Sequence, residues 1–256
     1  MTRIDLEGAV ALVTGSSRGV GAATARALAR AGARVAVNYV RNEPAARAVS
    51  EAIEADGGAP PLLVRADVGD EEARRRLHAE VAERLGPPLI LVSNAATDAR
   101  NPFDEPDDRA FLSRWRTTMA VNLEAAAHLA LLALPAMRAA RFGRIVVVAS
   151  RSAFRAETDH PDYAVSKAGL VNLARCLARA EGPNGVTANA VCPGWVDTDK
   201  VRETLAQRGE AVRAEIPLGR GATPDDVAGA ILFLVSPLGS YCNGVAIPLN
   251  GGSYLH

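Results

Sequence analysis

The sequence of 256 residues has no net charge, only three cysteines, 4% aromatic residues and almost no lysine. Its 29 basic side chains are balanced by 29 acidic ones, so it lacks the basic excess typical of proteins that bind nucleic acids or anionic membranes. Cys176, Cys192 and Cys242 are odd in number and far apart, so they indicate neither a disulfide framework nor a metal site. These absences exclude a secreted disulfide scaffold and favour a reducing compartment.

Long hydrophobic runs are absent as well. The longest apolar stretch, from Ala125 to Met137, contains His128 and Pro135 and is shorter than the ~20 residues that cross a bilayer. The first residues are polar and contain no apolar signal-peptide segment. We therefore expect a cytoplasmic protein with no membrane partner and no nucleic-acid partner.

Runs rich in β-branched residues alternate with longer Ala-rich segments. Six runs are apolar throughout, as expected of parallel strands buried on both faces: 10–13, 35–37, 62–64, 89–92, 145–148 and 186–191. Helices are predicted between and after them, at 21–31, 44–55, 70–85, 109–137, 162–181, 200–215 and 225–235, before a last segment at 245–248. This alternation predicts one α/β domain over residues 1–256, a doubly wound parallel sheet with helices on both faces. The segment 195–216 is a candidate substrate lid.

A glycine-rich segment, Thr14-Gly15-Ser16-Ser17-Arg18-Gly19-Val20-Gly21, follows the first predicted strand and opens a helix. Glycines allow a tight turn and a close approach to a pyrophosphate, which the helix N-terminus attracts with its unpaired N–H groups. The spacing GxxxGxG differs from the common GxGxxG fingerprint, so an ordinary tight turn between strand and helix is the alternative.

The end of the second predicted strand bears on the choice of cofactor. NAD-binding folds place a carboxylate there for the ribose 2′-OH, whereas this sequence has Asn38-Tyr39, followed by Arg41. Arg18 and Arg41 can together hold a 2′-phosphate, which favours NADP(H) over NAD(H). The alternative is that both are ordinary surface arginines.

Tyr163 and Lys167 stand at the start of the helix after the fifth strand, and Lys167 is one of only two lysines, with Lys200. The i, i+4 spacing places phenol and ammonium on one helix face. A neighbouring ammonium favours the phenolate, so the pKa of Tyr163 is expected to fall from about 10 toward the working pH of an acid–base catalyst.

Two polar residues in apolar surroundings complete the set. Ser150 ends the fifth strand and can hydrogen-bond a carbonyl oxygen in the same crevice, or simply cap the strand. Asn122 interrupts an apolar helical segment and needs partners, either a water chain toward Lys167 or a helix-backbone contact.

With the glycine loop, these four residues resemble the short-chain dehydrogenase/reductase family, and the similarity covers nearly the whole chain. Further matching segments are Asp67-Val68, Asn94-Ala95, Val191-Cys192-Pro193-Gly194-Trp195-Val196-Asp197-Thr198, and Gly251-Gly252. The resemblance implies a single-domain Rossmann-like sheet of about seven strands. It also implies hydride transfer between a nicotinamide cofactor and a carbonyl or alcohol, without a metal.

The resemblance also implies a role for each matching residue. Tyr163 is the acid or base, Ser150 polarises the carbonyl, Lys167 binds the nicotinamide ribose and lowers the pKa of Tyr163, and Asn122 supports a proton relay. The cofactor-binding residues implied by the motifs, with those at the second strand, are Gly15, Ser17, Arg18, Gly19, Val20, Gly21, Asn38, Tyr39, Arg41, Asp67, Val68, Asn94, Ala95, Pro193, Gly194, Val196 and Thr198.

The most similar subgroup is the 3-oxoacyl-carrier-protein reductase type, which prefers NADPH and forms homotetramers; a dimer is the alternative. Its carrier-protein docking position falls on Arg141, whereas the second docking position is Asn184, which is not basic. Ala96 replaces a family glycine near the cofactor and adds a Cβ there. The loop between Ser150 and Tyr163 is more polar than a fatty acyl chain requires.

Three functions remain open. The first is an NADPH-dependent ketoreductase acting on a β-keto thioester, carrier-bound or polyketide-like, or a related ketone. The second is an NAD(P)-dependent alcohol dehydrogenase acting on a sugar, cyclitol or steroid. The third is a cofactor-binding sensor without turnover.

Overall fold

The computed structural model describes residues 4–198, 209–211 and 213–255. Its core is one seven-stranded sheet in which every strand pairing is parallel, with the order β3-β2-β1-β4-β5-β6-β7. The strands are β1 (Val10–Val13), β2 (Arg34–Tyr39), β3 (Leu62–Arg65), β4 (Ile90–Ser93), β5 (Gly143–Val148), β6 (Val186–Pro193) and β7 (Ala246–Leu249). The predicted doubly wound parallel sheet is confirmed.

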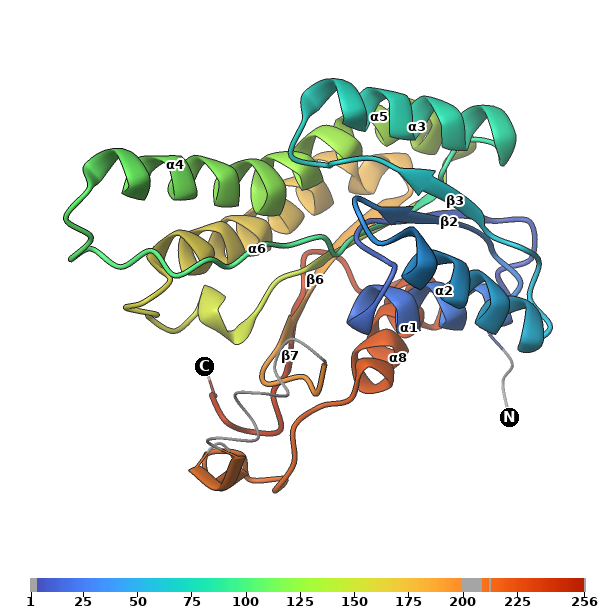
Figure 1. Cartoon of the computed structure of the whole chain (residues 1–256). Helices are drawn as coiled ribbons and strands as arrows, with labels where there is room; N and C mark the ends of the chain where they lie inside the picture. The colour runs from blue at the N-terminus through green and yellow to red at the C-terminus, as the bar shows by residue number, and fades with distance from the viewer. Residues whose placement is uncertain (1–3, 199–208, 212, 256) are drawn as a thin grey trace.

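Helices cover both faces of the sheet (Figure 1). One layer contains α1 (Gly19–Arg30), α2 (Glu43–Ala55) and α8 (Pro224–Val235). The other contains α3 (Glu71–Arg84), the long helix formed by α4 (Asp108–Met119), the π-helical segment η1 (Ala120–Glu124) and α5 (Ala125–Ala140), and finally α6 (Pro161–Glu181). Short 3-10 turns complete the described elements: η2 (Arg151–Ala153), η3 (Gly182–Asn184) and η4 (Pro237–Gly239).

The strands are apolar throughout because alternate side chains enter two different cores. Val13, Val37 and Val92 pack with α1, α2 and α8, whereas Leu12 and Leu91 pack with α3 and α5 on the opposite face. All of these side chains are fully buried. A strand with two buried faces has no polar alternation, which explains why the sequence pattern identified the first six strands; β7 is only partly buried and was expected as a last segment at 245–248.

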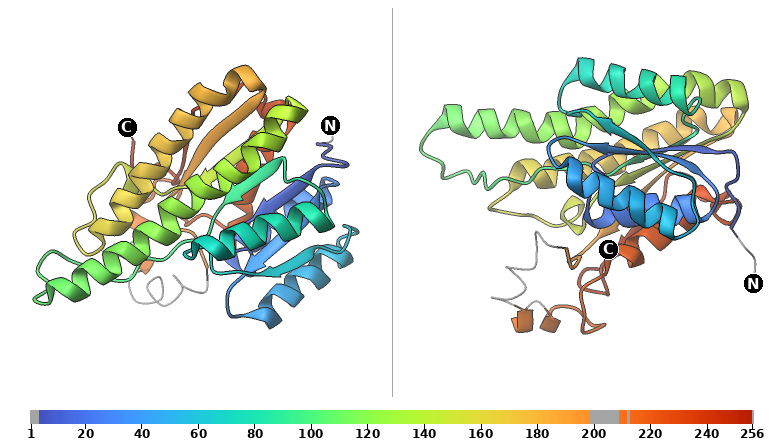
Figure 2. Two further views of the ribbon diagram at one scale, coloured as in Figure 1. Left: turned by 90° about the horizontal axis from the view of Figure 1, so that it is seen from above. Right: turned by 45° about the vertical axis from the view of Figure 1, so that its right-hand side comes forward.

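The predicted helix at 109–137 is present and slightly longer, but its apolar length differs from the sequence expectation. It runs from Asp108 to Ala140 and is long and apolar enough, by length and composition, to cross a membrane, whereas the sequence predicted a stretch too short to do so. Pro135 is exposed and the helix continues past it. The buried side chains of α5, such as Leu129 and Met137, pack against the sheet, and Figure 2 shows the helix lying beside α6. These buried side chains of the helix therefore belong to the protein core.

The turn before β7 is attached to β6 by one buried side chain. Asn189 is 0% exposed; its Nδ2 donates to the Cys242 carbonyl at 2.8 Å, and its Oδ1 accepts from the Val245 N–H at 3.1 Å. This side chain fixes the last strand beside β6, whose carboxyl end continues into Pro193-Gly194.

Replacing Asn189 with Ala should destabilise the protein by about 2 kcal/mol, because two buried backbone groups lose their partners. Urea unfolding of both proteins measures the difference. Asn172→Ala, at an exposed position of α6, is the control and should stay within about 0.5 kcal/mol of wild type. Equal stability of the Asn189 and Asn172 variants would contradict this role.

Candidate active site

The candidate site lies where the strand order reverses, between β1 and β4. In open parallel sheets, ligands bind in the crevice outside the carboxyl ends of the strands at this point. The chain places its glycine loop here, between the end of β1 and the start of α1. Gly15 and Gly19 have φ values of +61° and +54°, a backbone region that other residues rarely adopt.

Hydrogen bonds hold the glycine loop against the end of β4. The Thr14 Oγ1 accepts from the backbone N–H groups of Asn94 and Ala95, each at 3.0 Å. The Asn94 Nδ2 donates to the carbonyls of Thr14 and Gly15, at 2.9 and 3.0 Å. A Cβ at Gly21 would lie 2.5 Å from the Gly15 oxygen and 2.6 Å from the Asn94 Nδ2. Bonds within the chain therefore fix the shape of the loop.

Asn38 holds the other side of the glycine loop. It is 1% exposed, its Oδ1 accepts from the Gly15 N–H at 3.1 Å, and its Nδ2 donates to the Ala66 carbonyl at 2.9 Å. The sequence predicts Asn38 as a cofactor-binding residue; in the structure, its side-chain atoms are engaged in bonds that join β1, β2 and β3. Asn38 therefore supports the glycine loop from the side of β2.

The helix N-terminus fits a phosphate group. Arg18 is the N-cap of α1 and provides no side-chain cap, so the N–H groups of the first turn receive no capping acceptor. Arg18 and Arg41 are both exposed, at the ends of the neighbouring strands β1 and β2. No carboxylate lies between the end of β2 and Arg41. Backbone, helix terminus and charge at this edge all suit a phosphorylated dinucleotide.

The other predicted cofactor residues follow strand ends along the same edge. Asp67, after β3, is exposed, and its Oδ1 accepts from the Gly69 N–H at 2.9 Å. After β6, a Cβ on Gly19 would lie 3.3 Å from the Cγ2 of Thr198, so this segment approaches the glycine loop. The structure brings to this edge the full predicted set: Gly15, Ser17, Arg18, Gly19, Val20, Gly21, Asn38, Tyr39, Arg41, Asp67, Val68, Asn94, Ala95, Pro193, Gly194, Val196 and Thr198.

The predicted catalytic residues meet at the ends of β5 and η1 and the start of α6. Lys167 is 2% exposed, and its Nζ donates to the Val148 carbonyl at 2.7 Å and lies 5.3 Å from the Tyr163 ring centroid. A side-chain hydrogen bond joins Ser150 to Tyr163. The i, i+4 pair therefore shares one face of α6, directed at the end of β5.

The pKa of Tyr163 differs from the sequence prediction. Burial raises it from 10.0 to about 12, although the hydrogen bond from Ser150 opposes the shift. Removing a phenolate from water costs more here than that single bond returns. The prediction that this pKa is lowered is wrong for the protein as described, and Tyr163 is a protonated phenol at neutral pH.

Asn122 has partners that the sequence did not predict. Its Oδ1 accepts from the Thr97 N–H at 2.8 Å, and its Nδ2 donates to the Thr97 carbonyl at 2.9 Å and to the Ser166 Oγ at 3.0 Å. These bonds join the π-helical segment to the loop after β4 and to α6. Such π-helical segments are frequently found at functional sites.

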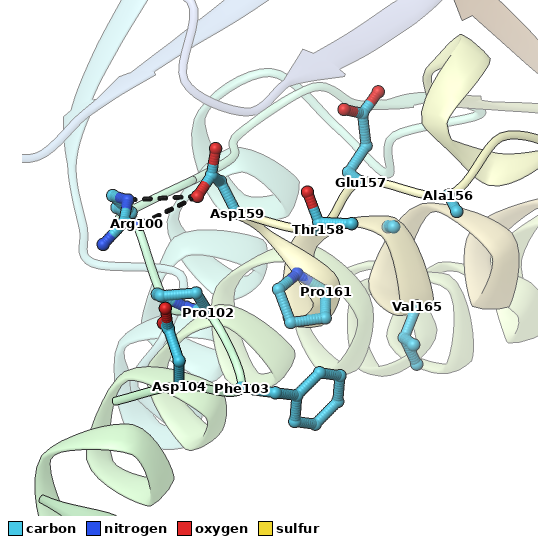
Figure 3. A pocket seen from close by; sticks show the side chains of 11 residues that line it. Arg100, Pro102, Phe103, Asp104, Ala156, Glu157, Thr158, Asp159, Pro161 and Val165 are labelled. Carbon is cyan, nitrogen blue, oxygen red and sulfur yellow. Dashed lines mark hydrogen bonds and ion pairs between the residues drawn. The ribbon is translucent and has the colours of Figure 1, made fainter. Parts of the chain in front are cut away.

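Sequence reasoning missed two residues next to Ser150. The Ser150 Oγ lies 3.1 Å from the Ser152 Oγ, which donates to the Glu157 Oε1 at 3.0 Å. Their position in the polar loop before Tyr163 was the available signal. Glu157 also lines an open pocket of about 580 Å³ between the loop after β4 and the start of α6, shown in Figure 3 with the Arg100–Asp159 ion pair. The predicted catalytic residues are not among those lining this pocket.

Comparison with known proteins identifies the family. The family model described as enoyl-(acyl carrier protein) reductase matches residues 15–254. The chain is 36% identical, over 98% of its length and 100% of the relative, to the 3-oxoacyl-(acyl-carrier-protein) reductase FabG of Pseudomonas aeruginosa. The chain belongs to the short-chain dehydrogenase/reductase family and is an NAD(P)-dependent oxidoreductase.

Two solved structures extend the similarity to different substrates. A protein from Beutenbergia cavernae, provisionally named an NAD(P)-dependent gluconate 5-dehydrogenase and carrying NADP at low occupancy, is 37% identical with a TM-score of 0.89, covering 98% and 99% of the two chains. A 3-oxoacyl-(acyl-carrier-protein) reductase from Agrobacterium tumefaciens with NADP bound is 35% identical with a TM-score of 0.89, covering 97% and 95%. Both relatives bind NADP, but their names differ in substrate.

Replacing Gly21 with Ala should weaken NADPH binding by at least about tenfold, because the added Cβ forces the Gly15 carbonyl and the Asn94 side chain to move. The enhancement of NADPH fluorescence on binding measures this loss. Gly229→Ala, in α8 with nothing within 4 Å of the added Cβ, is the control and should bind NADPH like wild type. Equal affinity of the two variants would show that the close packing at Gly21 does not shape the site.

Proposed function

We propose that this enzyme is an NADPH-dependent ketoreductase, and that its substrate is a β-keto thioester or a related ketone. The observation that carries the proposal is the buried Tyr163, which has Ser150 as a hydrogen-bond partner and the Lys167 Nζ 5.3 Å from its ring centroid. A protonated phenol beside a second hydroxyl suits the delivery of a proton to a carbonyl oxygen. The names of the relatives from Pseudomonas aeruginosa and Agrobacterium tumefaciens support the thioester class.

Each residue then has a defined task. The bound nicotinamide supplies the hydride that reduces the carbonyl carbon. Ser150 donates a hydrogen bond to the ketone oxygen, and Tyr163 gives that oxygen its proton as the alkoxide forms. Lys167, anchored on the Val148 carbonyl, holds the ribose beside Tyr163. Asn122 keeps η1 against α6 through Ser166, so it positions the site rather than touching the reacting atoms.

With NADPH and an acetoacetyl thioester, the purified enzyme should oxidise NADPH, and Tyr163→Phe should lose at least about a hundredfold in kcat, within the range of general acid catalysis. The variant should still bind NADPH, because the ring remains. Absorbance of NADPH follows the reaction. Full activity of Tyr163→Phe would overturn the mechanism.

An inactive wild-type enzyme would have a different meaning. Reduction of NADP⁺ or NAD⁺ with a panel of sugars, cyclitols and steroids would then identify an alcohol dehydrogenase, the function that the name of the Beutenbergia cavernae relative favours. NADPH binding without turnover on either panel would identify a sensor.

The cofactor preference rests on Arg18 and Arg41, since both are exposed and the end of β2 lacks the carboxylate that NAD-binding folds place there. Replacing both with Ala should raise the KM for NADPH about tenfold or more, because charge-assisted bonds to the 2′-phosphate are lost. The KM for NADH, which has no 2′-phosphate, serves as the internal control and should change little. Steady-state kinetics with each cofactor measure the two KM values. An equal rise in KM for NADPH and NADH would show that these arginines do not bind the 2′-phosphate.

The cellular location, the oligomeric state, the lid and the carrier-protein contact are also part of the proposal. We propose a cytoplasmic, single-domain protein that forms a homotetramer, or a dimer, and whose lid at 195–216 covers the substrate; residues 199–208 and 212 lie outside the described part. Arg141 is exposed at the end of α5, with φ +52°, and is our candidate contact for an acidic carrier protein. Asn184 supports this less, because its Nδ2 donates to the Glu181 Oε2 at 2.9 Å.

A further inference from the structure

The wall of the site next to Ser150 contains a buried guanidinium. Arg151 follows Ser150 directly, and its side chain is 9% exposed. Its Nη1 makes a single hydrogen bond, to the Ser253 Oγ at 3.3 Å. The nearest carboxylate oxygen, Glu215 Oε2, is 3.9 Å from Nη1, too far for a hydrogen bond. A guanidinium has five N–H donors, so the described chain leaves most of them without an acceptor.

A second donor without an acceptor lies beside this guanidinium. The Arg151 Cζ is 5.2 Å from the centroid of the Trp195 ring. The Trp195 Nε1 is buried and has no hydrogen-bond partner among the described residues. Trp195 follows Gly194 at the end of β6, and Arg151 follows Ser150 after β5, so both residues lie after strand ends that border the crevice in which the ketone is proposed to bind. Buried donors normally have acceptors, and an exception calls for a ligand or water.

Two carboxylates, Glu215 and Glu157, balance the charges of Arg151 and Arg155, but neither is held by Arg151 in a hydrogen bond. Arg155 Nη1 is also 3.9 Å from the same Glu215 Oε2, so two cations share one loosely held, half-exposed carboxylate. Glu157 is the other acidic group acting on Arg151, and its Oε1 is already hydrogen-bonded to Ser152. Burial, and next the charge of Arg155, lower the pKa of Arg151. A buried cation with such loose pairing is costly unless a further anion completes it.

We propose that Arg151 and the Trp195 Nε1 form a subsite for a carboxylate of the substrate, so that the ketone reduced by this enzyme is an oxo acid. A guanidinium presents a planar pair of donors that matches a carboxylate. Ser150 and Arg151 are consecutive residues of the same loop, so the proposed carbonyl and carboxylate positions border the same part of the crevice. This assignment rests on the hydride transfer proposed above and selects, among the proposed substrates, a related ketone with a free carboxylate rather than a simple β-keto thioester.

Matched pairs of ketones that differ only in the carboxylate test this subsite. Acetoacetate and levulinate, each compared with its methyl ester, are reduced with NADPH while its absorbance is followed. For at least one pair, kcat/KM should be about tenfold or more higher for the acid, mainly through a lower KM, because the ester cannot accept two charge-assisted bonds. Reduction of both pairs without any preference for the acid would overturn the subsite and leave the ketoreductase standing.

Variants of the two neighbouring arginines locate the effect. Arg151→Met keeps the length of the side chain and should abolish the preference for the acid, whereas Arg155→Met, the matched control in the same loop, should retain it. Trp195→Phe keeps the ring, removes the Nε1 donor and should reduce the preference. An apolar replacement of a buried charge is often neutral or stabilising, so Arg151→Met should keep its melting temperature and its NADPH affinity. Equal preferences in both arginine variants would overturn the assignment.

A binding measurement separates this subsite from the proposed reaction. Calorimetry of the NADPH-loaded enzyme with glutarate, an unreactive dicarboxylate, and with its dimethyl ester requires no turnover. The subsite is supported if the wild-type enzyme and Arg155→Met bind glutarate but not its dimethyl ester, while Arg151→Met does not bind glutarate. This result would hold even if no ketone is reduced. If no ketone is reduced and the wild-type enzyme does not bind glutarate, the subsite is overturned together with the proposed reaction.

Discussion

The hydrogen bonds around Thr14 and Asn94 are the constraint on which the rest of the site depends. They join the ends of β1 and β4, the two strands between which the sheet order reverses. Gly21 brings α1 so close that an added Cβ would lie 2.5 Å from the Gly15 oxygen. Asn38 completes the loop from the side of β2. Because these groups bond to one another, the helix N-terminus is oriented toward the crevice before a ligand arrives.

Tyr163, the proposed proton donor, shows how burial decides the protonation state of a side chain. Its neighbour Lys167 is directed to the Val148 carbonyl, so α6 is attached to the end of β5. The hydrogen bond from Ser150 stabilises the phenolate, but burial outweighs it and raises the pKa to about 12. A protonated phenol donates a proton in ketone reduction. Alcohol oxidation would require a group that lowers this pKa, such as a cationic cofactor ring.

The substrate is determined by the walls of the crevice, since one fold can carry out the same chemistry on many substrates. The solved relatives share the fold at a TM-score of 0.89 and both bind NADP, yet one is named for an acyl thioester and the other for a sugar acid. In this chain the wall beside Ser150 carries Arg151, which makes one side-chain hydrogen bond among the described residues, and Trp195, whose buried Nε1 makes none. Their chemistry is suited to a carboxylate.

The sequence by itself determined the sheet, the glycine loop and the Tyr163–Lys167 pair, because each depends on residues that are near neighbours in the chain. Runs buried on both faces are apolar throughout, and an i, i+4 pair shares a helix face in any context. Only the tertiary structure decided the bonds of Asn38 and Asn122, the pKa of Tyr163 and the burial of Arg151. Each of these is set by groups distant in sequence, such as Ala66 for Asn38 and Ser253 for Arg151. Burial and hydrogen-bond partners arise only when the elements pack together, so the local sequence pattern cannot predict them.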